Sequence, residues 1–172
     1  MANYAPSTRA RIADLITGMR VDTSILDASD YLKNATATED IFNVYGRIKV
    51  MQLFMEVITL LDTKATVMYY TYTSDTPAET VQPISVVSAT MSAMKPGARH
   101  VCLGTTVATA CVIDANHGFS PLIMKEKLIL GANEGVGNIG INTTTADMLS
   151  GTIRFSLFYV PMSDGAYATN VV

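Results

Sequence analysis

Short runs of β-branched and aromatic residues dominate the sequence from Asp40 onward. Glycine, proline, asparagine and aspartate separate these runs about every 8–12 residues, a spacing typical of all-β sandwiches and barrels. Strands are predicted near residues 41–45, 48–60, 66–73, 84–91, 100–103, 106–113, 122–130 and 152–160. Because no helical period interrupts the series, the sheets are expected to be antiparallel. The predicted fold class is all-β, an antiparallel β-sandwich or jelly-roll-like barrel.

Two segments carry information about packing. In segment 152–160 one alternating set of residues predicts a core-facing side. This set consists of Ile153, Phe155, Leu157 and Tyr159. In segment 48–61 both alternating sets are mainly apolar, which predicts a strand covered on both sides, although a helical period fits this segment as well. The glycine-rich segment from Gly131 to Gly140 is interpreted as a long loop.

The first 36 residues differ from the rest of the chain in pattern and in charge. A short amphipathic helix is predicted from Ser7 to about Gly18, followed by an extended connector without a sustained period. Residues 1–20 carry a net charge of +2, whereas the remaining residues carry −5. The expected organisation is an N-terminal arm, residues 1–36, and a β-sandwich domain, residues 37–172. The candidate residues for contact between this arm and a partner are Arg9, Arg11 and Arg20.

Composition adds an expectation about self-association. Of the 172 residues, 49% are apolar and 16% are charged, and the mean hydropathy is +0.27. Since a domain of this size buries only about 70% of its unfolded surface, the excess apolar side chains are expected to lie in a subunit interface. The net charge of −3 argues against nucleic acid as a partner. Neither a membrane-spanning run nor a signal peptide is recognised, which predicts a protein made in a cytoplasm.

Candidate chemistry is sparse. No nucleophile motif adjoins His100 or His117, and Cys102 and Cys111 match no zinc-binding spacing. Gly135 to Gly140 spells G-x-G-x-x-G, but a dinucleotide site requires a helix directly after the motif, and the residues that follow are poor helix formers. We therefore predict no catalytic residues, no metal, no cofactor and no small-molecule substrate. The two cysteines are interpreted as buried thiols.

Two patterns of oxygen-bearing side chains indicate chemistry more weakly. Asp114, Asn116 and Asp147 would suit calcium, but they lack the spacing of a calcium loop. Paired carboxylates drive glycoside hydrolysis, yet no pair can be singled out by sequence. The candidates for such a pair are Glu56, Glu79 and Glu126, each of which is interpreted as a solvated strand residue.

Two stretches of the sequence resemble a recurring class of small virion proteins of tailed bacteriophages. They are IFNVYGRIKVMQLFMEVIT and NIGINTTTADMLSGTIRFSLFYVPMSDGAYA, which together cover a little under a third of the chain. They are similar to an "LFNV-x-G" opening strand, a late "G-x-I-x-L-N" strand and a closing strand with a short apolar tail. The residues that match the closing pattern are Gly151, Ile153, Arg154, Phe155, Leu157, Tyr159, Val160, Pro161, Gly165 and Ala166.

The resemblance implies a virion structural protein of the capsid decoration, or cement, type, located on the capsid surface. Its expected partners are the major capsid protein and further copies of itself, with a homotrimer favoured because several weak contacts then add up to avidity. No nucleic acid and no membrane partner is expected. Two alternatives remain open: a tail or baseplate component, and a small glycan-binding or hydrolytic β-sandwich.

Overall fold

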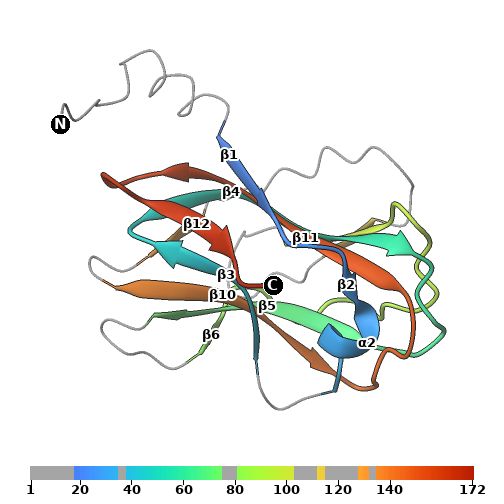
Figure 1. Ribbon diagram of the computed structural model, residues 1–172. Coiled ribbons are helices and arrows are strands. Elements are labelled where there is room, and N and C mark those ends of the chain that lie inside the picture. The colour runs from blue at the N-terminus through green and yellow to red at the C-terminus, as the bar shows by residue number, and fades with distance from the viewer. Residues whose placement is uncertain (1–17, 35–37, 75–80, 103–111, 115–127, 132–134) are drawn as a thin grey trace.

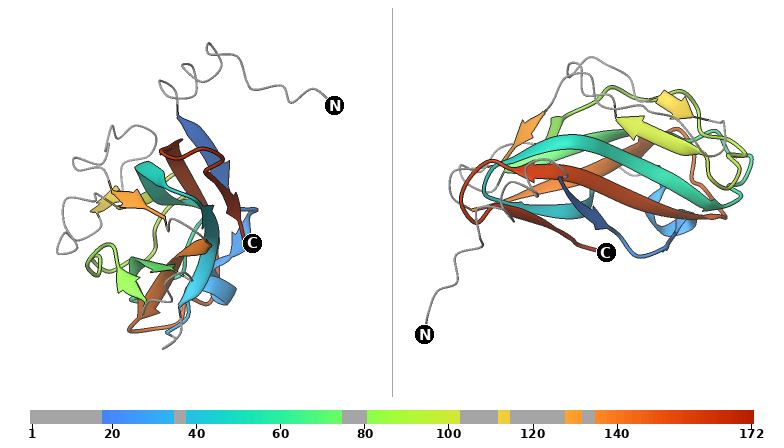
Figure 2. Two further views of the ribbon diagram at one scale, coloured as in Figure 1. Left: turned by 90° about the vertical axis from the view of Figure 1, so that its left-hand side faces the viewer. Right: turned by 90° about the horizontal axis from the view of Figure 1, so that it is seen from above.

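The computed structural model describes residues 18–34, 38–74, 81–102, 112–114, 128–131 and 135–172. In these residues the chain forms two antiparallel sheets that pack face to face, with a single short helix, α2 (Ala28–Tyr31), at one end (Figures 1 and 2). The prediction of an all-β sandwich is therefore confirmed.

Sheet A has seven strands among the described residues. Its main path runs through β1 (Met19–Asp22), β11 (Thr152–Pro161), β4 (Ile48–Thr59), β7 (Arg99–Cys102) and β8 (Val112–Asp114). Two short strands lie beside this path: β2 (Leu26–Asp27) pairs with β11, and β9 (Ile129–Leu130) pairs with β4. Strands β4 and β11 form the longest pair of the sheet and place the predicted 48–60 and 152–160 strands side by side.

Sheet B has five strands in the described part of the chain. In spatial order they are β12 (Tyr167–Asn170), β3 (Glu39–Tyr45), β10 (Val136–Thr144), β5 (Val67–Ser74) and β6 (Gln82–Pro83). From β3 to β5, and again from β10 to β12, each successive strand lies in the other sheet. Neighbours within a sheet are therefore mostly distant in sequence.

A β-bulge explains how β4 buries residues of both alternating sets. The register against β11 shifts between Phe158 and Tyr159, which pair with Gln52 and Val50. The intervening Met51 is the extra residue of the bulge, and it reverses the side on which the following residues lie. The fully buried side chains of β4 are accordingly Ile48 and Val50 before the bulge, and Leu53, Met55 and Val57 after it.

The core lies between the two sheets. On β11 the predicted core face is confirmed, because all four of its side chains are at most 2% exposed. They pack with the inward residues of sheet B, which include Phe42, Val44, Met68, Tyr70, Ile139 and Ile141. Burial of these aromatic and branched side chains stabilises the fold. The segments with the strongest apolar alternation in the sequence therefore lie at its centre.

The first described residues of the chain belong to sheet A of the sandwich. Strand β1 pairs with β11 from Met19 opposite Tyr159 to Asp22 opposite Ser156, and β2 pairs with the start of β11. The prediction of an extended connector is therefore wrong in part, because this region forms two edge segments of sheet A followed by the helix α2. All three elements precede the expected domain boundary at residue 36. The predicted helix from Ser7, with Arg9 and Arg11, lies outside the described residues.

The prediction of a strand at 84–91 is wrong, and two serine side chains explain why. Ser85 Oγ accepts the hydrogen bond of Tyr70 N–H at 2.9 Å, and Ser88 Oγ accepts that of Met68 N–H at 3.3 Å. Hydroxyl groups thus take the place of backbone carbonyls along β5, so the segment follows the edge of sheet B without forming a ladder. The backbone N–H groups of Ile84 and Ser88 still donate to the carbonyls of Tyr70 and Met68, and an isolated bridge joins Thr66 to Met91.

The prediction of a loop from Gly131 to Gly140 is also wrong over its second half, because β10 begins at Val136. This strand runs between β3 and β5 at the centre of sheet B. Its glycines lower its strand propensity, but neighbouring side chains use the space they leave: a Cβ on Gly137 would stand 2.0 Å from the Tyr72 hydroxyl. The apolar tail implied by the resemblance contains a further strand, β12, which pairs with β3.

Candidate functional site

A row of arginine and phenylalanine side chains crosses the side of sheet A that faces away from sheet B. Its members are Arg20 on β1, Arg154 and Phe158 on β11, Phe54 and Glu56 on β4, and Arg99 on β7. These residues alternate with the core residues of the same strands, so the pleat of the sheet places all of them on one side. We call this set the arginine–phenylalanine row.

Stacking contacts order the first half of the row. The Arg20 guanidinium lies 5.1 Å from the centroid of the Phe158 ring, and the Phe158 and Phe54 rings stack at 6.2 Å with an 18° angle between their planes. The Arg99 guanidinium lies 5.0 Å from the Phe54 centroid. As a result Phe54 is only 4% exposed although it points away from the core.

Ion pairs with Glu56 hold two of the three arginines. Arg154 Nη2 lies 2.7 Å from Glu56 Oε2, and Arg99 Nη2, whose guanidinium also stacks on Phe54, lies 3.5 Å from Glu56 Oε1. At such partly exposed positions each contact contributes less than about 1 kcal/mol to folding. The main consequence of the row is therefore that long side chains are held in fixed positions on an accessible surface.

Asp22 completes the row at the β1 edge. Partial burial favours its neutral form, but the hydrogen bond from Arg20, the nearby Ser156 hydroxyl and the charges of Arg20 and Arg154 outweigh this effect and lower the pKa of Asp22 below its usual value. The carboxylate is thus ionised at neutral pH, with Arg20 Nε 2.8 Å from its Oδ1. The row and Asp22 together contain three cations and two anions, a net charge of +1, on a chain whose total is −3.

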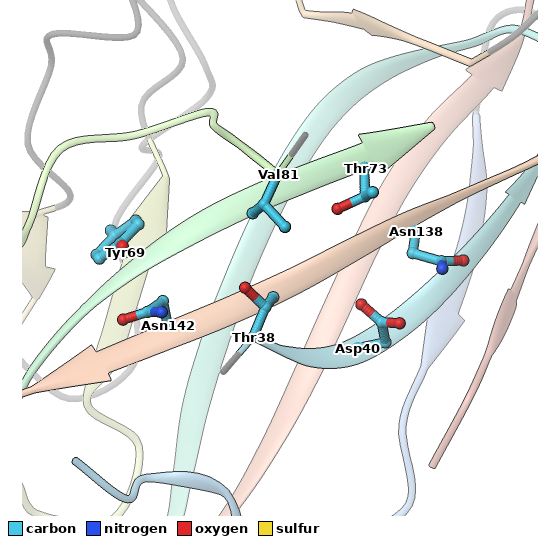
Figure 3. Close-up of a pocket in the computed structure, with 7 residues that line it drawn as sticks. All are labelled: Thr38, Asp40, Tyr69, Thr73, Val81, Asn138 and Asn142. Carbon is cyan, nitrogen blue, oxygen red and sulfur yellow. The ribbon is translucent and has the colours of Figure 1, made fainter. Parts of the chain in front are cut away.

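A second feature lies on the side of sheet B that faces away from sheet A. It is a hollow of about 550 Å³, lined by Thr38, Asp40, Tyr69, Thr73, Val81, Asn138 and Asn142 (Figure 3). Tyr69 and Asn142, which are register partners, stand at one end, and Thr73 stands with its partner Asn138 at the other. We call this feature the sheet B hollow.

Gly140 explains why the floor of the hollow is low. It lies between Asn138 and Asn142 on the same side of β10, and a Cβ there would be 2.4 Å from Thr38 Cγ2 and 3.0 Å from Thr71 Oγ1. The absence of a side chain lets Thr38 lie close to the sheet. Thr71 is 1% exposed, and no described group hydrogen-bonds to its Oγ1. A buried, unpaired hydroxyl group therefore lies beside the floor.

The structure places the sequence candidates as follows. Of the three arginines proposed for partner contact, Arg20 is in the arginine–phenylalanine row, whereas Arg9 and Arg11 lie outside the described residues. Glu56 is the anion that holds Arg99 and Arg154, so it is not a solvated strand residue. The row could not be recognised from the sequence, because its members come from four strands that are neighbours only in the folded protein.

The remaining candidates do not come together as a site. His100 is fully buried and packs against the Tyr70 ring at 5.7 Å, and this burial lowers its pKa from 6.5 to about 4. Cys102 is buried, as interpreted from the sequence, and its thiol lies 4.0 Å from the carbonyl oxygen of Ile84. Asp147 Oδ1 accepts the backbone N–H of Asn34 at 2.6 Å. The G-x-G-x-x-G segment lies largely within β10, which is not followed by a helix. His117, Cys111, Asn116, Glu79 and Glu126 lie outside the described residues.

Comparison of the chain with protein-family models, with curated proteins and with solved structures gives no significant match. Within the described ranges, no three histidine, cysteine or acidic side chains group closely enough to hold a metal ion. The helical structure in those ranges includes nothing long and apolar enough to cross a membrane.

Proposed function

We propose that this protein is a capsid decoration protein of a tailed bacteriophage, which binds the major capsid protein lattice as a homotrimer and stabilises the head. The observation that carries the proposal is the arginine–phenylalanine row. Arginine and aromatic residues are the side chains that most often dominate the binding energy of protein interfaces. Because Arg20, Arg99 and Arg154 are already held by neighbours, less side-chain entropy is lost when a partner covers them.

The sequence resemblance supports the same proposal, and β1 connects it with the N-terminal arm. Arg20 belongs both to β1, the first described strand, and to the row. We infer that the arm and the row contact the capsid as one continuous surface. In this arrangement Arg9 and Arg11 pair with carboxylates of the shell protein, and the row packs against its outer surface.

Locating the chain in purified phage particles tests the proposal. Several hundred copies on the shell, seen by particle reconstruction and by quantitative mass spectrometry, are the expected result. A few copies at the tail would favour the tail or baseplate alternative, and absence from the particle would contradict both. The hydrolytic alternative requires two carboxyl groups at one site, and the described residues that line the sheet B hollow include one carboxylate, Asp40.

A further inference from the structure

We propose that the sheet B hollow is a binding site for a short neutral oligosaccharide. The volume of about 550 Å³ lies within the range of small-molecule sites, roughly 300–1,000 Å³. The hollow is on the opposite side of the sandwich from the arginine–phenylalanine row. A ligand can therefore occupy it while the row is covered by a partner.

The side chains that line the hollow match the chemistry of sugar hydroxyl groups. Asn138 and Asn142 each offer a carbonyl acceptor and an NH₂ donor, Asp40 offers acceptors, and the threonine hydroxyls serve in both roles. A sugar hydroxyl is also both donor and acceptor, so it pairs with any of these groups. Tyr69 adds an amphipathic ring beside Asn142, suited to the apolar face of a pyranose.

Charge selects against other ligands of similar size. The seven lining residues include one carboxylate and no arginine or lysine. A phosphate, a sulfate or an acidic sugar would lie beside the carboxylate of Asp40, and the described lining residues include no arginine or lysine to attract it. The described lining is also too polar to favour an apolar ligand, because Val81 is the one aliphatic residue among its seven members. A neutral, hydroxyl-rich ligand remains.

The length of the hollow indicates more than one sugar ring. Asn138 and Asn142 are four residues apart on one strand, so their Cα atoms are separated by about 13 Å. Figure 3 shows polar side chains at both ends of this span, with Thr38 and Val81 between them. An elongated ligand of two or three rings contacts both amides at once, whereas a monosaccharide reaches only one end.

The unpaired hydroxyl of Thr71 is an independent sign that the site is incomplete without a ligand. Buried polar groups in folded proteins are nearly always hydrogen-bonded. Thr71 Oγ1 is buried beside Gly140 and Thr38, below the residues that line the hollow. We assign it the role of a hydrogen-bond partner that the bound saccharide reaches through one water molecule when the Thr38 side chain turns aside.

Titration of the intact protein with neutral disaccharides and trisaccharides tests the site. The probes are maltose, cellobiose, lactose, mannobiose, chitobiose and their trisaccharides, each at up to 10 mM in calorimetry and in NMR spectra of labelled protein. We expect at least one of them to bind and to shift the resonances of β5 and β10. Asn138→Ala and Asn142→Ala should each weaken that binding by about tenfold or more, because a site built to hydrogen-bond hydroxyls discriminates strongly when a partner is lost.

Two further variants separate binding from stability. Asn170→Ala removes an amide on β12, which does not line the hollow, and should leave the dissociation constant within about twofold. Thr71→Val removes the unpaired hydroxyl with little change of shape, so it should weaken saccharide binding while the melting temperature stays the same or rises.

The proposal is overturned if none of the saccharides binds at 10 mM. It is equally overturned if the hollow variants bind as tightly as the unaltered protein, or if Asn170→Ala weakens binding as much as they do. Loss of capsid occupancy in the hollow variants without any saccharide binding would show that the hollow is a protein contact instead. Capsid binding through sheet A is measured separately, so either function can fail without the other.

Discussion

The hydroxyl oxygen of Tyr159 accepts a hydrogen bond from the backbone N–H of Ala168 at 3.0 Å. Tyr159 belongs to β11 of sheet A and Ala168 to β12 of sheet B, so this bond joins the two layers directly. Both residues are buried, at 2% and 8% exposure. The aromatic ring fills the core, and its polar end satisfies a backbone group of the opposite sheet.

Replacing this tyrosine tests the link between the layers. Tyr159→Phe keeps the ring but leaves the Ala168 N–H without its partner, so we expect a loss of about 1–3 kcal/mol in the free energy of unfolding. Urea denaturation followed by circular dichroism provides the measurement. Tyr167→Phe, at an exposed tyrosine on β12, is the matched control and should cost much less. Equal stabilities of the Tyr159 variant and the unaltered protein would contradict the role assigned to the bond.

The two sides of β11 should respond differently to truncation. Phe155→Ala leaves a cavity in the core and should cost about 3–5 kcal/mol, because the side chain is fully buried. Arg154→Ala removes the partly exposed ion pair to Glu56 and should cost less than about 1 kcal/mol. Equal losses for both variants in denaturant melts would refute the assignment of the faces.

Burial of His100 predicts a dependence of stability on pH. Its pKa is about 4 in the folded protein, compared with 6.5 as its ordinary value. Stability is therefore complete above pH 6.5 and falls as the pH decreases toward 4, because the unfolded chain takes up a proton that the folded chain excludes. From pH 7 to pH 5 the loss should be about 2 kcal/mol.

Urea melts at pH 5, 6 and 7 measure this dependence, and His100→Gln provides the comparison. The variant is expected to be less stable at pH 7 but to lose much less stability on acidification. If both proteins lose stability in parallel between pH 7 and pH 5, His100 is not the group responsible.

Removal of the N-terminal arm tests the proposed capsid contact. A deletion of residues 2–17 retains β1 and its pairing with β11, so the protein should fold and keep its oligomeric state. Its occupancy on undecorated capsids should fall, and attachment of the intact protein should weaken as salt screens the arginines. Full decoration by the truncated protein would show that the arm is not the anchor.

Charge-matched variants separate the arginines from the loss of chain length. The double variant Arg9→Ala, Arg11→Ala should reduce occupancy, and Arg20→Ala should reduce it further by disturbing the start of the row. The double variant Lys64→Ala, Lys95→Ala removes two exposed positive charges elsewhere in the chain and should bind as the unaltered protein does. Equal losses for both double variants would indicate a nonspecific effect of charge.

Sedimentation of the purified protein tests the expected self-association. Several large apolar side chains are exposed in the single chain, among them Ile25, Leu60, Ile129 and Leu149 at 57–63%. We expect a stable oligomer, a trimer, with an interface of about 2,000 Å² or more in total. A monomer at micromolar concentration in analytical ultracentrifugation would contradict this expectation.

Strands with strong apolar alternation could be predicted from the sequence, because their burial dominates local preferences. This applies to β3, β4, β5 and β11, whose bounds agree with the prediction within about two residues. Strand β10 could not be predicted on this basis, since Gly137, Asn138 and Gly140 disfavour a strand and tolerate it only because Tyr72 and Thr38 occupy the space beside them. Segment 84–91 has apolar residues of the right kind, but the hydroxyls of Ser85 and Ser88 replace the ladder.

Neither surface feature was accessible to sequence reasoning. Arg99 and Arg154 are 55 residues apart and meet at Glu56 only because β7 and β11 pair with opposite edges of β4. The sheet B hollow likewise depends on the pairing of β5 with β10. Polar residues on such strands look like ordinary solvent-facing positions until the spatial order of the strands is known.

The spatial order of sheet A also determines when the protein can fold during synthesis. Strand β4 ends at Thr59, but its longest partner, β11, begins only at Thr152. At a ribosomal rate of roughly 5–20 residues per second, β4 waits about 5–20 s for that partner. For this interval a twelve-residue apolar strand has an unpaired edge, which is the kind of nascent segment that chaperones bind and that aggregates when they are scarce. The yield of soluble protein in a cell therefore depends on how well β4 is protected while translation continues.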